Sequence, residues 1–271
     1  MAVKLIIEDI LQYVQENVFI SDLKIEDVAS CFGYDKYYFS REFKKITGYS
    51  LNEYTSSIKT EKAIEMIQSK KNVTTIQSSV GYSSSGSFSN TFKKYTGSSP
   101  KQYMGEMNTL YSQVKNFETS ASKSLDYYES SHNSFCHVKI DVPGHFQSGI
   151  IFIGLFNTPI PNHKPIVGLA TKSMNLNKLK NIPDGDYYLL ACAIDASNNI
   201  LSYFHLKNCL RGKINEKLSF PTCNGSHYTI NLRPRISEDP PILINVAKLL
   251  VSVLKKRPQC RIIFLTSFVI K

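Results

Sequence analysis

One stretch of this 271-residue sequence carries polar and basic side chains that suit contact with a nucleic acid. An arginine on a helix face can make two hydrogen bonds to a guanine edge, and a lysine there can neutralise a phosphate. If the stretch is helical, with 3.6 residues per turn, five such side chains share one face. They are Lys36, Tyr37, Ser40, Arg41 and Lys44.

The same stretch belongs to an internal repeat. A first copy runs from Ile25 to Gly48 and a second from Thr74 to Gly97. Both copies contain Gly-Tyr, Phe-Ser, Phe-Lys-Lys and Thr-Gly in the same order. Because there are only two copies, a solenoid is not indicated. We therefore expect two similar supersecondary units.

Each copy predicts a short helix, a tight turn and a second helix. Gly33 suits the turn, because a residue without a Cβ enters the left-handed region at little cost. Asp35 suits the N-cap of the second helix, and Phe39 and Phe43 lie four residues apart on its buried side. This is the pattern of a helix-turn-helix, whose second helix lies in the major groove of DNA.

A longer helix is expected between the two copies, from Leu51 to Gln68, where apolar residues recur at helical spacing. Such a helix spans roughly 26 Å. It would act as a stiff spacer that holds two recognition helices one DNA turn apart, about 34 Å.

Residues 5–107 resemble the DNA-binding domain of the AraC/XylS family of bacterial transcription regulators. The resemblance implies two helix-turn-helix motifs that read adjacent major-groove segments of double-stranded DNA. It covers roughly two fifths of the chain. The matching residues are Val80-Gly81-Tyr82, Phe88-Ser89, Phe92-Lys93-Lys94, Thr96-Gly97 and Ser99-Pro100.

The resemblance also assigns a second recognition surface by position. Asn90, where the family often has arginine, suits adenine, whereas Arg41 suits guanine. Gln77 replaces the small residue that the family prefers. At least one lysine of Lys44-Lys45 and one of Lys93-Lys94 is expected to contact phosphate. The second surface consists of Ser85, Gly86, Ser87, Ser89, Asn90 and Lys93.

The net charge of +10 is distributed unevenly. Residues 1–110 contain 13 Lys and Arg against 12 Asp and Glu, whereas residues 111–271 contain 19 against 10. If total charge alone were considered, the nucleic acid would be placed on residues 111–271 and not on the half that contains the repeat. The local distribution is more informative, since residues 81–104 hold three lysines and no acid.

The second half predicts a different kind of domain. Residues 108–134 are rich in serine and are expected to be a linker, in which Tyr111 to Phe117 extend a helix. Residues 135–271 are expected to be β-rich. Short apolar runs between Pro and Gly turns predict an antiparallel sandwich. The runs 149–156 and 181–188 resemble carboxypeptidase-regulatory-like, transthyretin-type sandwiches, which implies a non-catalytic module. The expected strands are 135–142, 149–156, 187–195, 200–206 and 227–232.

The C-terminal end is expected to form a helix and a strand. Pro240-Pro241 precede a predicted helix from Ile242 to Lys256, and Arg261 to Ile270 predicts a final strand. The helix has only a narrow polar stripe, so more than one of its sides must be covered. It packs inside its own domain, or it forms a subunit interface in a homodimer.

No catalytic constellation appears in the sequence. The six histidines lack metal-binding spacing, the six cysteines form no C-x-x-C pair, and no G-x-S-x-G or phosphate-binding glycine loop occurs. No apolar run approaches the ~20 residues of a membrane span. We therefore expect a cytoplasmic protein that is not an enzyme and needs no metal, cofactor or membrane.

The sequence thus predicts a multidomain transcription regulator. An all-α double helix-turn-helix domain, 1–107, precedes a mostly β, sandwich-like domain with a C-terminal helix and strand. The expected partners are double-stranded DNA and RNA polymerase. The C-terminal domain is expected to sense an unidentified small-molecule effector, to dimerise, or both. In the alternative, it is a protein-interaction module without an effector.

Overall fold

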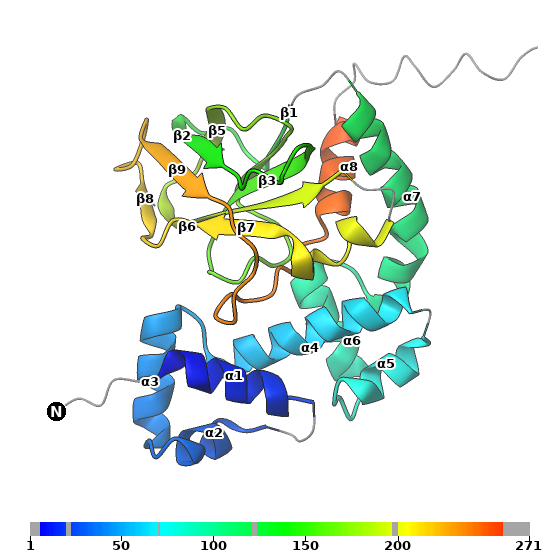
Figure 1. Ribbon diagram of the computed structural model, residues 1–271, viewed down its shortest axis with the longest axis vertical. Helices are drawn as coiled ribbons and strands as arrows, with labels where there is room; N and C mark the ends of the chain where they lie inside the picture. The colour runs from blue at the N-terminus through cyan, green and yellow to red at the C-terminus, as the bar shows by residue number, and fades with distance from the viewer. Residues whose placement is uncertain (1–5, 20–22, 70, 121–123, 197–199, 257–271) are drawn as a thin grey trace, which may run out of the picture.

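The computed structural model describes residues 6–19, 23–69, 71–120, 124–196 and 200–256. A helical N-terminal part lies against a strand-rich C-terminal part, which confirms the predicted order of the two (Figure 1). Within the described residues, every helix is too short or too polar to cross a bilayer. The N-terminal helices are α1 (Ile7–Asn17), α2 (Ile25–Cys31), α3 (Lys36–Thr47), α4 (Leu51–Gln68), α5 (Val73–Ser79), α6 (Ser85–Thr96) and α7 (Pro100–Thr119).

Helix α4 has the predicted bounds and joins two similar helical units. Its first half is buried with α1 and α3 through Tyr54 and Ile58. Its second half is buried with α5 and α6 through Ala63 and Ile67. One continuous helix, about 27 Å long, therefore contributes to both cores.

The C-terminal part contains two sheets. The larger has the strand order β1-β4-β3-β6-β7, with β8 also paired to β6, and the smaller has the order β5-β2-β9. Neighbouring strands are antiparallel except β2 and β9, which run parallel, so the antiparallel prediction is wrong for that pair. The strands are β1 (Ser124–Tyr128), β2 (Ser134–Asp141), β3 (Gly149–Phe156), β4 (Val167–Thr171), β5 (Asn177–Ile182), β6 (Gly185–Asp195), β7 (Leu210–Lys213), β8 (Leu218–Phe220) and β9 (His227–Asn231).

The two faces of the larger sheet are covered differently. One face shares a core with the smaller sheet, in which Val138 and Ile140 of β2 pack with Ile153 of β3. The other face is covered by α7 and by α8 (Val246–Lys256), which lie side by side (Figure 1). Leu250 of α8, 2% exposed, is buried in this second core, so the helix packs within its own chain.

Three expectations for the second half need correction. Residues 108–134 contain more regular structure than a linker. The helix expected at Tyr111 to Phe117 is the end of α7, in which Leu110, Val114 and Phe117 recur at helical spacing and are buried, and β1 pairs with β4. The predicted strand 200–206 is instead two 3-10 helices, η1 (Ile200–Tyr203) and η2 (Leu206–Asn208). The C-terminal helix begins only at Val246. The predicted strand 261–270 lies outside the described residues.

The late start of α8 has a local cause. The side-chain oxygen of Asn245 accepts a hydrogen bond from the backbone N–H of Lys248 at 2.9 Å. This bond satisfies a donor that the first turn of a helix cannot pair internally, so Asn245 acts as the N-cap.

Candidate nucleic-acid interface

The turn between the two helices is built identically in both repeats. Gly33 and Gly81 have φ of 71° and 75°, the left-handed conformation that glycine adopts most easily. The next residue then returns its N–H to the first helix: Tyr34 to Ala29 O at 2.8 Å, and Tyr82 to Gln77 O at 3.1 Å. The predicted glycine turn is confirmed in both copies.

Gln77 keeps this geometry although it is larger than the alanine at the matching position. Its side-chain amide also donates to Tyr82 O, at 3.1 Å, and so crosses the turn a second time. The half-buried glutamine therefore adds a bond without displacing the backbone bond.

The N-termini of the two recognition helices are capped by different side chains. Asp35 accepts from the N–H groups of Tyr37 and Tyr38 at 2.9 and 3.0 Å, which confirms its predicted role. Ser84 accepts from the N–H of Ser87 at 3.1 Å. The hydroxyl of Ser84 also donates to the hydroxyl of Ser87 at 3.0 Å, so Ser87 takes part in the cap.

The C-termini of these helices again match. Gly48 and Gly97 end α3 and α6 with φ of 80° and 79°. The hydroxyl of Thr47 donates to Phe43 O and Tyr49 O at 2.7 and 2.9 Å. Thr96 makes the same two bonds in the second repeat, at 2.8 and 3.0 Å.

The predicted contact residues of α3 lie together on an exposed face. Tyr37 is 79% exposed, and the buried side of the helix is formed by Phe39 and Phe43. Arg41 lies over the ring of Tyr38, 5.8 Å from its centre, which orients the guanidinium along the helix surface. The exposed residues of this face are Lys36, Tyr37, Ser40, Arg41 and Lys44.

The predicted contact residues of α6 form a smaller and less charged surface. Phe88 and Phe92 are buried beneath it. Ser89 is half-buried, whereas the remaining candidates are exposed. The exposed ones are Ser85, Gly86, Ser87, Asn90 and Lys93.

Ion pairs distinguish the two surfaces further. Lys36 pairs with Glu26 of α2, and Arg41 Nε lies 3.2 Å from Glu42. Within the described chain, neither Lys44 nor Lys93 forms an ion pair. These two lysines are therefore available to phosphate without first losing a carboxylate partner.

A contact that the sequence does not indicate lies at the C-terminal ends of both recognition helices. Residues 157–166, between β3 and β4, reach both repeats. Ile160 is buried in the core of the first repeat. The N–H of His163 donates to Tyr95 O at 2.5 Å in the second. The prolines of this segment predicted only a turn, since nothing in their pattern indicates what the turn touches.

The close fit of this segment explains why glycine ends both helices. A Cβ on Gly48 would lie 2.9 Å from Pro159 Cγ, and one on Gly97 would lie 2.8 Å from His163 Cδ2. The C-terminal ends of α3 and α6 thus face the β-rich part, whereas their N-terminal halves extend away from it (Figure 1).

Among the described residues, no group of three or more His, Cys, Asp and Glu is placed to hold a metal ion. His137 and His227 stack with ring centres 4.5 Å apart, on paired strands of the smaller sheet.

Comparison with known proteins gives the helical part a family. A family described as "Helix-turn-helix domain" matches residues 28–106. Transposon Tn10 TetD protein of Escherichia coli is 35% identical over 99 residues, which are 36% of this chain and 71% of that protein. Multiple antibiotic resistance protein MarA of Escherichia coli strain K12 is 35% identical over 98 residues, which are 36% of this chain and 76% of that protein.

Among solved structures, the C-terminal domain of AraT, a response regulator from Geobacillus stearothermophilus, is 33% identical. That match covers 39% of this chain and 88% of the AraT domain, with a TM-score of 0.36. In this chain the matched residues 28–106 include both glycine turns and both recognition helices described above. Through this domain, the chain belongs to the AraC/XylS family of helix-turn-helix transcription regulators.

Proposed function

We propose that this DNA-binding regulator reads two adjacent major-groove segments of one duplex, with α3 in the first and α6 in the second. The observation that carries the proposal is the shared helix α4, which contributes to the cores of both repeats. Since both cores pack on one continuous helix, the two recognition helices cannot rotate independently. A regulator of this kind acts in the cytoplasm, with RNA polymerase as its expected protein partner.

Base readout is proposed to differ between the two segments. Arg41 supports a bidentate contact to guanine, and Asn90 a contact to adenine. Tyr37 and Ser40 on α3, and the serines on α6, add further hydrogen bonds. Lys36, Lys44 and Lys93 are proposed to contact phosphates and set the position of the protein on the duplex.

The two-sheet C-terminal part is proposed to be a sandwich-like regulatory module. Its 157–166 segment touches the ends of both recognition helices. Arg235 adds a half-buried ion pair with Glu61 of α4, at 2.8 and 2.9 Å. A ligand that moved the module would therefore change the position of both motifs.

Self-association through the C-terminal part stays a second proposal. Leu243 and Leu250 are only 1% and 2% exposed within the single chain, so they do not form a free dimer face. Sedimentation of the full chain at tens of micromolar, with and without DNA, tests this proposal, and a monomer in both cases would contradict it.

The two-segment proposal is tested with DNA selected from a random library. Five base pairs inserted between the two segments turn one away from the other by about half a helical turn. Specific affinity should then fall to that of a single motif. Ten inserted base pairs restore the phase but not the distance, and they should not restore binding, because α4 cannot lengthen. Recovery at ten would show that the motifs move independently.

A further inference from the structure

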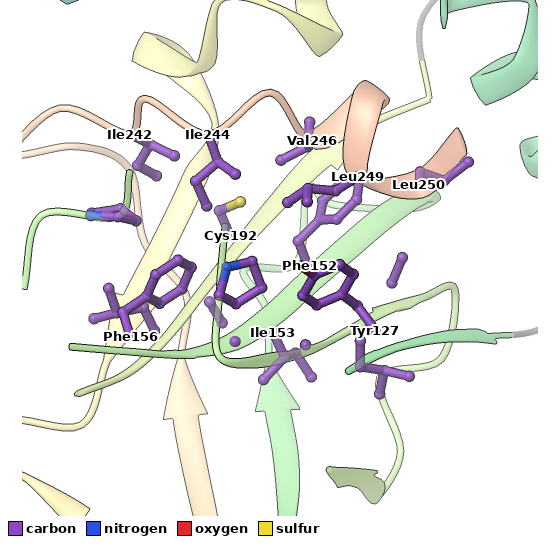
Figure 2. Close-up of a pocket in the computed structure, with 18 of the residues that line it drawn as sticks. Tyr127, Phe152, Ile153, Phe156, Cys192, Ile242, Ile244, Val246, Leu249 and Leu250 are labelled. Atoms are coloured by element: carbon purple, nitrogen blue, oxygen red, sulfur yellow. The ribbon is translucent and has the colours of Figure 1, made fainter. Parts of the chain in front are cut away.

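A cavity lies between the larger sheet and α8, and its wall is almost wholly hydrocarbon. Figure 2 shows Ile242 and Ile244, on the segment leading into α8, and Val246, the first residue of α8, opposite Phe152 and Phe156 of β3. Its volume is about 60 Å³. This is room for a short alkyl chain, since one water needs roughly 10–15 Å³ by the same measure.

A second, polar cavity of about 240 Å³ adjoins the first. Tyr127 and Leu249 line both cavities, so the apolar space and the polar one meet at these two side chains. Lys164 and Lys248 line the polar cavity, and none of its described lining residues is a carboxylate. The two lysines do have acidic partners nearby, Glu129 and Glu106.

One buried donor on a residue that lines this polar cavity lacks a partner. Asn245 is only 2% exposed, and its Nδ2 has no hydrogen-bond acceptor among the described residues. Its Oδ1 is committed to the N–H of Lys248, so the amide cannot turn to change which atom is free. Leaving a buried donor unpaired costs about 1–3 kcal/mol, which a ligand acceptor would recover.

The start of α8 adds to the preference for negative charge. Asn245 is the N-cap of this 11-residue helix, where the helix dipole is positive and N–H groups point outward. The opposite end of the apolar cavity is less suitable for binding a negatively charged group. There Asp239 already binds Arg233 at 2.6 and 2.9 Å, and the adjoining space is about 50 Å³.

We propose that the two cavities together bind an amphipathic monoanion, with its apolar tail between the sheet and α8 and its anionic group at Asn245 and Lys248. The proposal rests on the regulatory role proposed for the C-terminal part and names its ligand class. Thr96 and Gly97 also line the polar cavity, and Lys248 Nζ lies 2.6 Å from Ser98 Oγ. The bound anion would therefore lie at the end of recognition helix α6.

The test compares octanoate with 1-octanol, which has the same tail and no charge, on the full chain. The chain has no tryptophan, so calorimetry is the suitable measurement. Octanoate should bind roughly tenfold or more tightly than 1-octanol, as expected for a charged hydrogen bond. Absence of octanoate binding, or equal binding of the two compounds, would overturn the proposal.

Three variants locate the site. Asn245→Asp keeps the capping oxygen but replaces the free donor with a carboxylate, so it should abolish the preference for octanoate and retain 1-octanol. Ala170→Leu fills the apolar cavity and should weaken both compounds. Lys213→Gln, at the opposite end, is the matched control and should change neither. Unchanged octanoate binding in Asn245→Asp would refute the site.

DNA binding of each variant is measured separately, without either compound. If the wild-type protein binds DNA normally but does not bind octanoate, the ligand proposal is wrong and the proposed function is unaffected. Loss of two-segment DNA reading in the wild type would reject the proposed function alone.

Discussion

The two helix-turn-helix repeats have nearly the same backbone but differ in what surrounds it. The turn glycines, the returning N–H bonds and the threonine bonds at the helix ends agree from one repeat to the other. The exposed face of α3 carries charged and aromatic side chains, whereas the first half of the exposed face of α6 carries only serine, glycine and asparagine. The geometry of the motif is thus separable from the chemistry of its outer face.

Their attachment to the rest of the molecule differs as well. The core of the first repeat receives one buried residue from the β-rich part, Ile160. The core of the second repeat is continuous with the larger sheet, η1, η2 and α8, where Tyr103 donates to Phe204 O at 3.2 Å. The core of the first repeat is therefore nearly separate from the C-terminal half, whereas the core of the second repeat is part of it.

The largest expected effects come from the matched core phenylalanines. Phe43→Ala and Phe92→Ala should each cost about 3–5 kcal/mol of unfolding free energy, because both side chains are fully buried. Phe92→Ala should also reduce hydrogen-exchange protection in α7 and the larger sheet, whereas Phe43→Ala should act mainly in α1 to α3. Equal loss of protection in the sheet for both variants would show that the repeats are attached equally.

A smaller effect is expected from the two base-reading side chains. Arg41→Ala should cost about 1–3 kcal/mol on the selected site and relax the preference at one base pair. Asn90→Ala should cost less and act at a different base pair, because a neutral amide makes weaker bonds than a guanidinium. A binding-site library measures both, and an unchanged base preference for Arg41→Ala would contradict the assignment.

Removing the two helix caps should lower the free energy of unfolding by different amounts, with a difference of a few tenths of a kcal/mol to about 1 kcal/mol. Asp35→Ala removes two backbone bonds and Ser84→Ala removes one, so the first should be the more destabilising, within the usual range of about 0.5–2 kcal/mol. Urea unfolding measures the difference. Asp35→Asn retains the capping oxygen and serves as the control. If it lowers the free energy of unfolding as much as Asp35→Ala does, the effect comes from the charge and not from the hydrogen bonds.

The smallest effects concern phosphate contacts and salt. Lys93→Ala should weaken binding to all sequences alike and reduce the slope of log K against log salt by about one. Lys36→Ala should change the slope less, because Lys36 is paired with Glu26. Glu26→Gln should therefore strengthen binding at low salt. Equal slopes for the two lysine variants would show that the ion pair is lost on DNA.

Local sequence patterns predicted the helical part well. Glycine turns, the Asp35 cap and the apolar spacing of α4 are all decided within one or two turns of chain. The exposure of the predicted contact residues could also be predicted, because each of them lies on the same helix as two buried phenylalanines, which fix the buried side of that helix.

The sequence was less informative about the second half. Residues 200–206 form a short, mostly apolar run that is typical of a strand, but the neighbouring Tyr203 and Phe204 are both buried in the core shared with α7. The short strands β4, β5, β7 and β8 are defined by distant partners, and the contact of His163 with Tyr95 joins residues far apart in sequence. Such contacts depend on tertiary packing, which a local pattern does not encode.

Helix α4 also limits how a regulator of this design can evolve. One residue inserted into α4 would turn the second repeat by about 100° around the helix axis and advance it by about 1.5 Å. Because the two repeats would move relative to each other, either the second would lose its contact with the larger sheet or the first its contact with Ile160. Insertions and deletions are thus excluded from α4, and new target sites must arise by exchanging side chains on α3 and α6.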